Sequence, residues 1–335
     1  MRHILAFSAV LLVLMVFGVP HPARAWGTNG HLTICDLAYR NFTATTRASV
    51  ASLLHSRTGG ITVKGRGKMA DRRYTAFNLG CLEEDKLPRR NPDDHFINVP
   101  RETDVIPDAC LGESSCILSG ISRDIGILQD ASRTDEARVF ALMALGHWIG
   151  DIHQPLHVSF ADDRGGNGID AKLAGRCGRS SYSVKNLHGV WDACLLEAGL
   201  FEKVRKRADF KRTWSKTTIT YRAVDTLQAN TSLEEERRIV AGNPQTWAQE
   251  SFAIALDPQV LYCTRQGSTC RYSQDRVELT GRDKRRQLID QAYLARFAPV
   301  AENRVRLAGF RLAHLVNTAL DPDYRGPVRN STQAD

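Results

Sequence analysis

The sequence lacks several features that would point to particular classes of protein. It contains no C-x-x-C motif, no internal repeat, no low-complexity tract and no stretch composed like a linker. After residue 19 it also has no apolar run as long as the ~20 residues that a membrane-spanning helix needs. The strand signal is weak throughout. These absences argue against a repeat protein, a chain that crosses a bilayer beyond its first residues, and a fold built on large sheets.

One apolar run does occur, at residues 4–19, and it has the features of a secretory signal peptide. Arg2 precedes the run, and the triplet A-R-A at 23–25 supplies a cleavage site after it. The alternative is a membrane anchor, but the run is short for a span. We therefore expect residues 1–25 to be removed and Trp26 to become the N-terminus. The protein would then be exported, either periplasmic or secreted, with no membrane anchor.

The excess of positive charge is small. Lys and Arg number 45 against 37 Asp and Glu, which gives a formal net charge of +8 at pH 7. Removal of the two arginines Arg2 and Arg24 with the expected signal peptide leaves +6. A modest positive balance suits a polyanionic substrate, but exported proteins commonly have one. Charge alone therefore does not identify the function.

The chain has eight cysteines, all of them after the expected signal peptide. An even number of cysteines in an exported protein indicates disulfides. Short loops and elimination favour the pairs Cys110–Cys116, Cys263–Cys270, Cys177–Cys194 and Cys35–Cys81. Because eight cysteines allow about a hundred pairings, this connectivity is one interpretation among many. A zinc site made of cysteines is disfavoured, since no C-x-x-C occurs and thiols oxidise outside the cell.

Helical periodicity dominates the rest of the chain and predicts a mainly α fold. Helices are expected over 26–50, 117–130, 134–152, 187–200, about 203–227, 233–241, 244–256 and 283–320, the last kinked or broken at Pro299. Loops or irregular structure are expected at 56–68, 71–107 and 257–281, and a small β-hairpin near 169–173 and 182–184. We predict one compact domain over 26–322 and a flexible tail at 323–335. The protein is expected to be a monomer with no stable protein partner.

Two polar side chains interrupt the helix predicted over 134–152, which is otherwise apolar on almost every side. His147 and Asp151 are four residues apart, so on a helix they point the same way. A buried carboxylate costs several kcal/mol unless it is paired or bound to a metal. This cost is the main physical reason to interpret both residues as metal ligands.

A second set of ligand-type residues follows the same helix. Pro155 ends the helix, His157 comes directly after, and His188 and Asp192 repeat the four-residue spacing. A neutral imidazole and a carboxylate are both typical zinc donors. The two sets together predict a cluster of zinc ions.

At this point the sequence resembles the S1/P1-type zinc-dependent nucleases, whose relatives include the bacterial zinc phospholipases C. The resemblance covers nearly the whole chain after the expected signal peptide. It is carried by WGTNGH at 26–31, MAD at 69–71, HF at 95–96, HWIGDIHQPLH at 147–157, GGN at 165–167 and LHGVWD at 187–192, with support from WAQES at 247–251 and RLAHLVNTAL at 311–320. It implies the phospholipase C/P1 nuclease fold with a trinuclear zinc cleft.

The resemblance also implies which residues hold the three zinc ions. One ion would be held by Asp71, His95, His147 and Asp151, a second and more exposed ion by His157, His188 and Asp192, and the third by the amino group and carbonyl of Trp26 with His31 and Asp151. Asp151 would then bridge two ions. Because the amine of Trp26 must be free to bind metal, cleavage of the signal peptide would be part of activation.

The activity implied is that of an endonuclease for single-stranded DNA and RNA. It would cleave the P–O3′ bond to give 5′-phosphate products, act on 3′-nucleotides as a 3′-nucleotidase, and use a zinc-bridged hydroxide as nucleophile. Zinc would also stabilise the charge on the leaving 3′ oxygen. Asp71, Asp151 and Asn167 are the residues assigned to the chemistry, and Asn167 matches a residue near the scissile phosphate.

Substrate-binding residues follow less directly from the resemblance. Phe96 matches an aromatic residue that stacks on a base, although a core position is the alternative. Asn98 stands where the fungal enzymes have an Asp that contacts the base edge, so base preference would differ. The family has a cation three residues after the metal-binding Asp, but this chain has Tyr74 there. Arg72 and Arg73 are the candidates for that cation.

Two other functions remain open at this stage. A zinc phospholipase C shares the metal cluster but tends to have Glu at the position of Asp192. A non-catalytic zinc-binding protein would contain metal without phosphodiesterase turnover. The three protein ligands implied for the outer ion leave an open coordination position, which is typical of a catalytic zinc site.

Overall fold

A computed structural model describes residues 26–55, 76–111, 114–177, 184–229, 231–273, 277–279 and 285–327. Several predictions lie outside these residues: the signal peptide, the loop at 56–68, Asp71 with its neighbours Arg72 and Arg73, part of the predicted hairpin, and the tail after residue 327. In the described part of the chain, no helix is long and apolar enough to cross a membrane.

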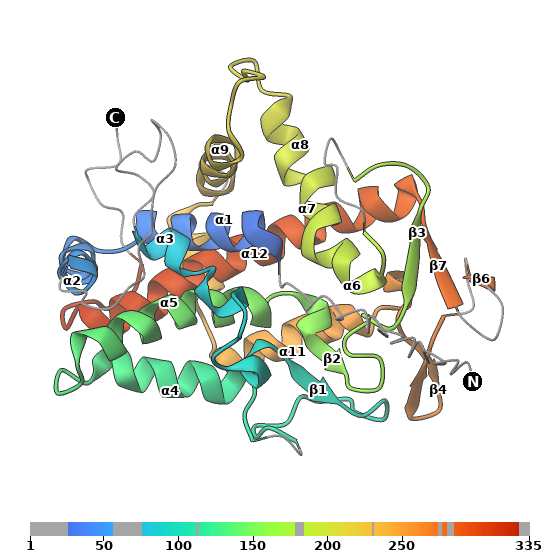
Figure 1. Cartoon of the computed structure of the whole chain (residues 1–335), viewed down its shortest axis with the longest axis horizontal. Coiled ribbons are helices and arrows are strands. Elements are labelled where there is room, and N and C mark those ends of the chain that lie inside the picture. The colour runs from blue at the N-terminus through green and yellow to red at the C-terminus, as the bar shows by residue number, and fades with distance from the viewer. Residues whose placement is uncertain are drawn as a thin grey trace, which may run out of the picture.

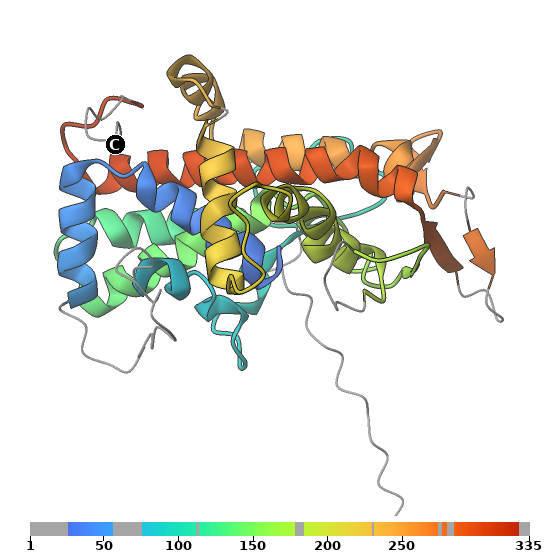
Figure 2. The same cartoon turned by 90° about the horizontal axis from the view of Figure 1, so that it is seen from above.

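Four helices form the centre of the fold. The 30-residue helix α12 (Gln291–Leu320) runs along the molecule, and α1 (Gly27–Arg40) and α5 (Asp135–Ile152) pack beside it (Figures 1 and 2). Helix α4 (Ile117–Gln129) covers the other side of α5. Helix α5 is buried on every side from residue 141 to residue 152, as its apolar sequence predicts. The mainly α single domain predicted from the sequence is confirmed.

Shorter helices surround this centre. They are α2 (Ala44–His55), α3 (Ala76–Gly80), α6 (Leu187–Gly189), α7 (Leu195–Ala198), α8 (Leu200–Arg205), α9 (Lys216–Ala229), α10 (Leu233–Ile239) and α11 (Pro244–Ala255). A π-helical segment, η4 (Val190–Cys194), joins α6 to α7. Single 3-10 turns are η1 (Glu83–Asp85), η2 (Pro92–His95), η3 (Pro155–His157) and η5 (Pro258–Val260).

Three small sheets complete the described structure. Strands β1 (Ile97–Val99) and β2 (Val158–Phe160) pair in parallel. Strand β7 (Arg285–Ile289) lies between β3 (Asp170–Leu173), which is parallel to it, and β6 (Val277–Leu279), which is antiparallel. Strands β4 (Thr264–Gln266) and β5 (Thr269–Arg271) form an antiparallel hairpin.

The hairpin predicted near 169–173 and 182–184 is tested only in part, because residues 178–183 lie outside the described residues. Strand β3 forms at 170–173 and pairs with β7 from the C-terminal part of the chain. Beside it, an isolated antiparallel bridge joins Asp170 to Asn186, and the amide of Ala171 donates to the carbonyl of Lys185. The hairpin of the described structure lies at 264–271, inside a stretch predicted as loop. Periodicity within one segment cannot reveal a strand partner more than a hundred residues away.

Three helix predictions also need correction. The helix expected over 26–50 ends at Arg40, and α2 begins at Ala44 because the Thr43 hydroxyl accepts a hydrogen bond from the Thr46 amide. The region around 203–227 is interrupted between Arg205 and Lys216. Residues 285–289 form strand β7 instead of helix, and α12 then continues through Pro299 without a break.

Four disulfides join the pairs predicted from the sequence. They are Cys35–Cys81, Cys110–Cys116, Cys177–Cys194 and Cys263–Cys270. Disulfides form and persist in oxidising compartments, which agrees with the expected export. The first of them joins α1 to the segment after α3, and both of these segments contribute to the site described below.

A buried arginine holds the C-terminal end of α5. Arg304 on α12 is 2% exposed, and it donates hydrogen bonds to the carbonyl of His153 (3.1 Å), the carbonyl of Trp247 (3.2 Å) and the hydroxyl of Ser251 (2.6 Å). It also pairs with Glu250 at 2.7 Å. The carbonyl of His153, the C-cap residue of α5, is thus satisfied by a side chain at the point where the chain turns before Pro155.

Replacing Arg304 with Met is expected to lower the free energy of unfolding by about 3 kcal/mol, because it leaves buried carbonyls without donors. Denaturant unfolding followed by circular dichroism measures this change. Arg306→Met is the matched control on the same helix, since Arg306 makes its contacts to Glu235 and Asn303 near the surface. The control should cost less than about 1 kcal/mol. Equal losses in both variants would contradict this role of Arg304.

Candidate metal centre

The centre of the site is the buried face of α5 that carries His147 and Asp151, both 0% exposed. Thr134 begins the helix by accepting a hydrogen bond from the Ala137 amide. Helix α1 lies close against this face because residue 150 is glycine. A Cβ there would lie 2.7 Å from Nδ1 of His31, so the small residue makes room for the imidazole.

An inner group of side chains converges on the Asp151 carboxylate. His31 Nε2 lies 3.3 Å from Oδ1, while His95 Nδ1 lies 3.1 Å and His147 Nε2 lies 3.5 Å from Oδ2. The three imidazoles come from α1, η2 and α5, and all are at most 1% exposed. The indole of Trp26 donates a hydrogen bond to the carbonyl of Gly150 at 2.8 Å, which places the start of α1 beside the same group.

An outer group lies next to the inner one. His157 in η3 and His188 in α6 face each other, with their Nε2 atoms 3.1 Å apart. Oδ1 of Asp192, in the π-helical segment, lies 3.5 Å from His188 Nε2 and 3.9 Å from His157 Nε2. Nδ1 of His157 is also 3.7 Å from Asp151, so the two groups are adjacent. π-helical turns are frequent at functional sites.

Backbone carbonyls fix the orientation of three of the imidazoles. Nδ1 of His147 lies 2.7 Å from the carbonyl of Cys81, and Nδ1 of His188 lies 2.6 Å from that of Gly165. Nδ1 of His157 contacts the carbonyl of His95 in the same way. Because a carbonyl only accepts, Nδ1 carries the proton in each ring and Nε2 keeps its lone pair. This arrangement is typical of histidines that bind metal through Nε2.

Several buried polar atoms of the site have no hydrogen-bond partner among the described residues. They are both ring nitrogens of His31, Nε2 of His95 and Oδ1 of Asp151. Burial raises the pKa of Asp151 and of Asp192 well above the usual range, and it lowers the pKa of His31 and of His188 to about 4. Neutral imidazoles are good zinc donors. A bound cation would satisfy these atoms and keep the carboxylates ionised, so the donor set fits zinc.

Sequence reasoning missed one carboxylate at this site. Asp85 in η1 has an oxygen 3.9 Å from Nε2 of His147, and it forms a potential ligand group with His147 and His31. The resemblance places Asp71 of the MAD motif in the ligand set, and Asp71 lies outside the described residues. The predicted Cys35–Cys81 disulfide was an available clue, since it brings the chain around Asp85 next to α1.

A cation also lies at the site. Arg89 donates a hydrogen bond to Asp85 at 2.7 Å and is 12% exposed. Its charge acts with burial to lower the pKa of His31 and of His188, one from each group. A guanidinium paired with Asp85 can provide directed N–H donors to a phosphate.

The other predicted site residues lie around the two groups. Phe96 follows His95 and is partly exposed. Asn98 lies in β1 opposite Ser159 of β2 and is also partly exposed. Asn167 donates to the carbonyl of Arg164 at 2.8 Å and accepts from Asn186. These contacts place Asn167 in the loop that also contacts His188.

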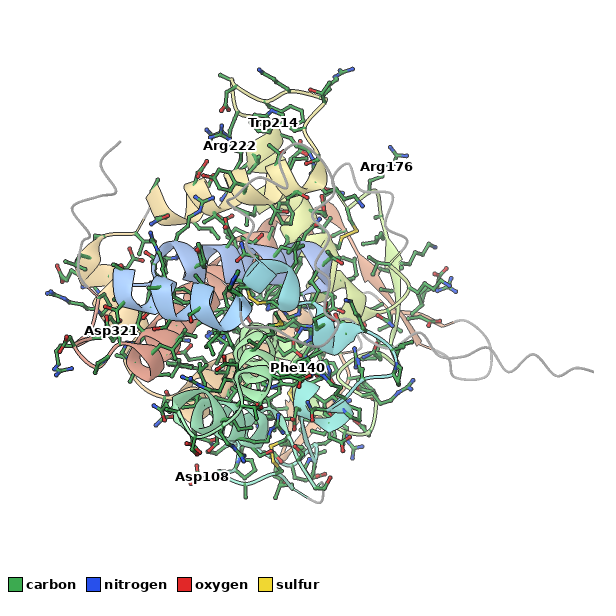
Figure 3. All side chains as sticks on the ribbon, turned by 60° about the vertical axis from the view of Figure 1, so that its left-hand side comes forward. Asp108, Phe140, Arg176, Trp214, Arg222 and Asp321 are labelled. Atoms are coloured by element: carbon green, nitrogen blue, oxygen red, sulfur yellow. A yellow bond between two sulfur atoms is a disulfide. The ribbon has the colours of Figure 1, made fainter. Side chains whose placement is uncertain are left out.

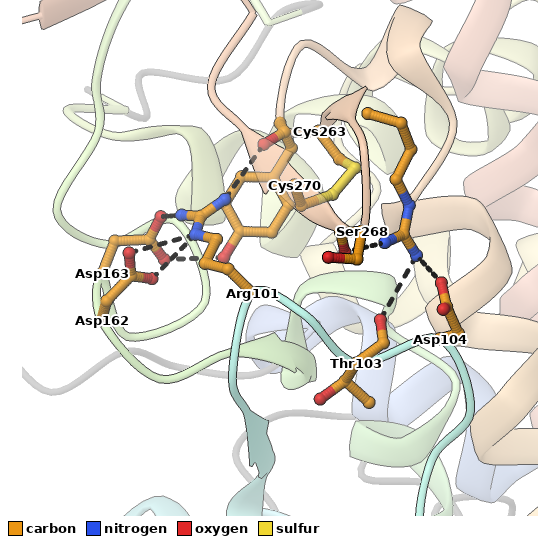
Figure 4. The surroundings of a disulfide bond; sticks show 10 residues. Arg101, Thr103, Asp104, Asp162, Asp163, Cys263, Ser268 and Cys270 are labelled. Carbon is orange, nitrogen blue, oxygen red and sulfur yellow. Dashed lines mark hydrogen bonds and ion pairs between the residues drawn. A yellow bond between two sulfur atoms is a disulfide. The ribbon is translucent and has the colours of Figure 1, made fainter.

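A buried carboxylate organises that loop. Asp163 is 7% exposed and accepts hydrogen bonds from the amide of Gly166 (2.8 Å) and the hydroxyl of Tyr262 (2.6 Å). It also pairs with Arg101, which Figure 4 shows reaching both Asp163 and its neighbour Asp162. Contacts thus run from Arg101 through Asp163 to the Gly165–Gly166 turn and on to His188.

Residue 165 must be glycine for this turn to form. Its φ is +63°, and a Cβ would lie 2.2 Å from the carbonyl of Leu156. The carbonyl of Gly165 can then meet Nδ1 of His188. Asp163 therefore supports an outer-group histidine without contacting it.

Replacing Asp163 with Asn is expected to weaken zinc binding by the outer group about 10- to 100-fold, as loss of a supporting hydrogen bond does at other metal sites. Zinc titration against a chelator of known affinity measures the effect. Asp162→Asn is the matched control, because Asp162 pairs with the same arginine but its side chain is 53% exposed. The control should bind zinc as the unmodified protein does. No difference between the variants would refute the supporting role of Asp163.

The fold and the site together define the class: a helical domain whose buried centre joins five histidines and three carboxylates in groups that could hold metal ions. Comparison with known proteins gives the same class. A family model described as S1/P1 Nuclease matches residues 26–321, and the chain belongs to the S1/P1 nuclease family. The predicted resemblance is confirmed, and with it a zinc-dependent nuclease that acts on nucleic acid.

Individual relatives are distant but extensive. The chain is 26% identical over 333 residues to Endonuclease 5 of Arabidopsis thaliana, covering 92% of this chain and 95% of the relative. It is 30% identical over 203 residues to Nuclease S1 of Aspergillus oryzae, covering 59% and 62%. It is 27% identical over 198 residues to Nuclease P1 of Penicillium citrinum, covering 58% and 66%.

Proposed function

We propose that this nuclease hydrolyses single-stranded DNA and RNA at the P–O3′ bond, giving 5′-phosphate products, and that it also removes phosphate from 3′-nucleotides. One observation carries the proposal. Neutral imidazoles and buried carboxylates lie together at the centre of the fold, and several of their nitrogen and oxygen atoms have no hydrogen-bond partner among the described residues. The related Nuclease S1 and Nuclease P1 support the reaction class.

Three zinc ions per chain are proposed for the centre. His157, His188 and Asp192 would hold the outer ion, and His31 with the amine and carbonyl of Trp26 would hold one inner ion. His95 and His147 would hold the other inner ion, with Asp151 between the two. Bound zinc supplies an activated water near neutral pH and positive charge for the phosphate and the leaving oxygen.

The surrounding residues would bind and orient the substrate. Arg89 pairs with Asp85, and its charge lowers the pKa of a histidine in each ligand group, so we propose that it binds the phosphate in place of Arg72 or Arg73. Asn167 would hydrogen-bond a phosphate oxygen from the loop that Asp163 fixes. Phe96 would stack on the base next to the scissile bond, and Asn98 would contact the base edge.

The proposal also covers processing of the N-terminus during export. Removal of residues 1–25 during export would free the amine of Trp26, which then completes its ligand set. The mature enzyme is proposed to be an exported monomer, periplasmic or secreted. The four disulfides support the oxidising compartment.

The function is tested by comparing substrates at equal enzyme concentration: single-stranded DNA, single-stranded RNA, duplex DNA, a 3′-nucleotide and phosphatidylcholine. The proposal expects cleavage of both single strands with 5′-phosphate ends, slower cleavage of the duplex, and release of phosphate from the 3′-nucleotide. Cleavage of phosphatidylcholine without turnover of nucleic acid would show that the phospholipase alternative is correct. Zinc content without any turnover would favour a non-catalytic protein.

Asp85 gives a sharper test of the ligand assignment. We propose that Asp85 takes the place assigned to Asp71, because its carboxylate meets His147 and His31. Asp85→Asn should lower the zinc content by about one ion and nuclease turnover by at least about 100-fold. Asp71→Asn is the matched control and should change neither quantity. If only Asp71→Asn loses zinc, the assignment from the MAD motif is correct instead.

A further inference from the structure

A basic turn projects from the body of the enzyme between α8 and α9. We call residues 206–216 the basic turn. It contains five cations and one acid in eleven residues: Lys206, Arg207, Lys211, Arg212, Lys216 and Asp209. Figure 1 shows this connection at the edge of the molecule, beyond the helices that form the core.

Most of the positive charge in the basic turn is uncompensated. Arg207 pairs with Asp209 at 2.9 Å, which neutralises the single acid. The other four cations are exposed, and none of them forms an ion pair with a described residue. Four exposed like charges in one turn repel each other, so this arrangement favours binding of a polyanion.

The basic turn also presents an aromatic side chain. The rings of Phe210 and Trp214 lie 5.5 Å apart edge to face, and the guanidinium of Arg222 on α9 lies 5.5 Å from the centre of the Trp214 ring. Figure 3 shows Trp214 and Arg222 next to each other, just below the tip of the projecting turn. Of the five tryptophans in the chain, Trp214 alone is partly exposed, and the other four are at most 1% exposed.

The basic turn is connected to the metal centre by a nearly continuous helical segment. Asp192 in η4 is followed by α7 and α8, which end at Arg205, directly before the turn. At a rise of 1.5 Å per residue, this segment spans at most about 20 Å. A polynucleotide held at the metal centre could therefore reach the basic turn, and a dinucleotide covers less of this distance than any longer substrate.

We propose that the basic turn is a second binding site for single-stranded nucleic acid, outside the catalytic centre. Lys206, Lys211, Arg212 and Lys216 contact the phosphate backbone, and Trp214 stacks on a base. Basic side chains interleaved with an aromatic ring bind single strands without sequence preference. The site would retain long substrates near the metal centre. This inference rests on the proposed action on single strands.

The proposed site should affect the KM of long substrates but not the hydrolysis of short ones. Removing two cations should raise KM for a long oligonucleotide roughly tenfold and leave kcat unchanged, because the lost contacts are far from the scissile bond. The slope of log KM against log salt should fall by about 1.4, since each single-strand phosphate contact contributes about 0.7. Hydrolysis of a dinucleotide should not change.

The experiment compares the zinc-loaded variants Lys211→Gln/Arg212→Gln and Arg133→Gln/Arg237→Gln. The second variant is the matched control, because it removes two exposed cations elsewhere on the surface and changes the net charge equally. Kinetics are measured on a 30-nucleotide single strand and on a dinucleotide at several salt concentrations. Equal KM values in the two variants on the long substrate would overturn the proposal. A larger KM for the first variant only, with unchanged dinucleotide hydrolysis, supports it.

Fluorescence gives a second readout that does not need turnover. Binding of oligothymidylate to the intact chain should quench the emission of Trp214, and Trp214→Phe should remove that quenching. Trp214→Ala should weaken binding about tenfold. Unchanged quenching in Trp214→Phe would overturn the stacking role. If the protein binds oligonucleotide at the turn but cleaves no nucleic acid, the function proposed above fails while this site stands.

Discussion

Asp151→Asn is expected to lower nuclease turnover by at least about 1,000-fold and to remove two of the three proposed zinc ions. The carboxylate lies within 3.1–3.5 Å of nitrogens from His31, His95 and His147, so one side chain serves the whole inner group. An amide has the same shape but lacks the negative charge and one acceptor oxygen. Both inner ions should therefore lose affinity together.

His157→Ala is the comparison that makes this test specific. His157 belongs to the outer group with His188 and Asp192, so its loss should mainly empty one site. Metal analysis of the two purified variants by mass spectrometry gives the zinc content per chain. Loss of the same number of ions in both variants would contradict the bridging role of Asp151.

Retention of extra residues before Trp26 is expected to abolish activity and to lower the zinc content by about one ion. The proposed inner site uses the amine of Trp26, and a peptide nitrogen cannot replace an amine as a metal donor. Trp26 is 1% exposed and its indole binds the carbonyl of Gly150, so its backbone has little freedom to move away. Under this proposal, the free N-terminus would be a requirement of the site as well as a result of export.

The test uses two forms of the chain produced in the same way: one that begins at Trp26 and one with two added residues, Gly-Ser, before it. Zinc content, circular dichroism and nuclease turnover are measured on both. Native circular dichroism in the extended form separates loss of the site from misfolding. Full activity and full zinc content in that form would refute the ligand role of Trp26.

Much of the site could be predicted because its residues carry strong local signals. A histidine and a carboxylate four residues apart on an apolar helix identified His147 and Asp151, and the same spacing identified His188 and Asp192. The structure brings these side chains together with His31, His95 and His157. The four disulfide pairs were also predicted, because three of them close short loops and the fourth follows by elimination.

The missed features depend on distant parts of the chain. Asp85 has no histidine four residues away on a helix, so the sequence pattern did not identify it. It lies beside His147 because the Cys35–Cys81 disulfide and η1 place it there. Strand β7 forms at the start of a segment that reads as helix, because it pairs with β3. The role of Asp163 depends on contacts from Arg101 and Tyr262, which lie far from it in sequence. Local periodicity in the sequence does not predict contacts between residues that lie far apart in the chain.

The most direct test of the central claim is the zinc content of the chain beginning at Trp26, measured on the same sample as its turnover of single-stranded DNA. The account predicts about three zinc ions per chain, turnover with 5′-phosphate ends, and loss of both on chelation with recovery when zinc is restored. Fewer than two zinc ions per chain in an active sample, or three ions in a folded sample that cleaves no nucleic acid, would contradict it.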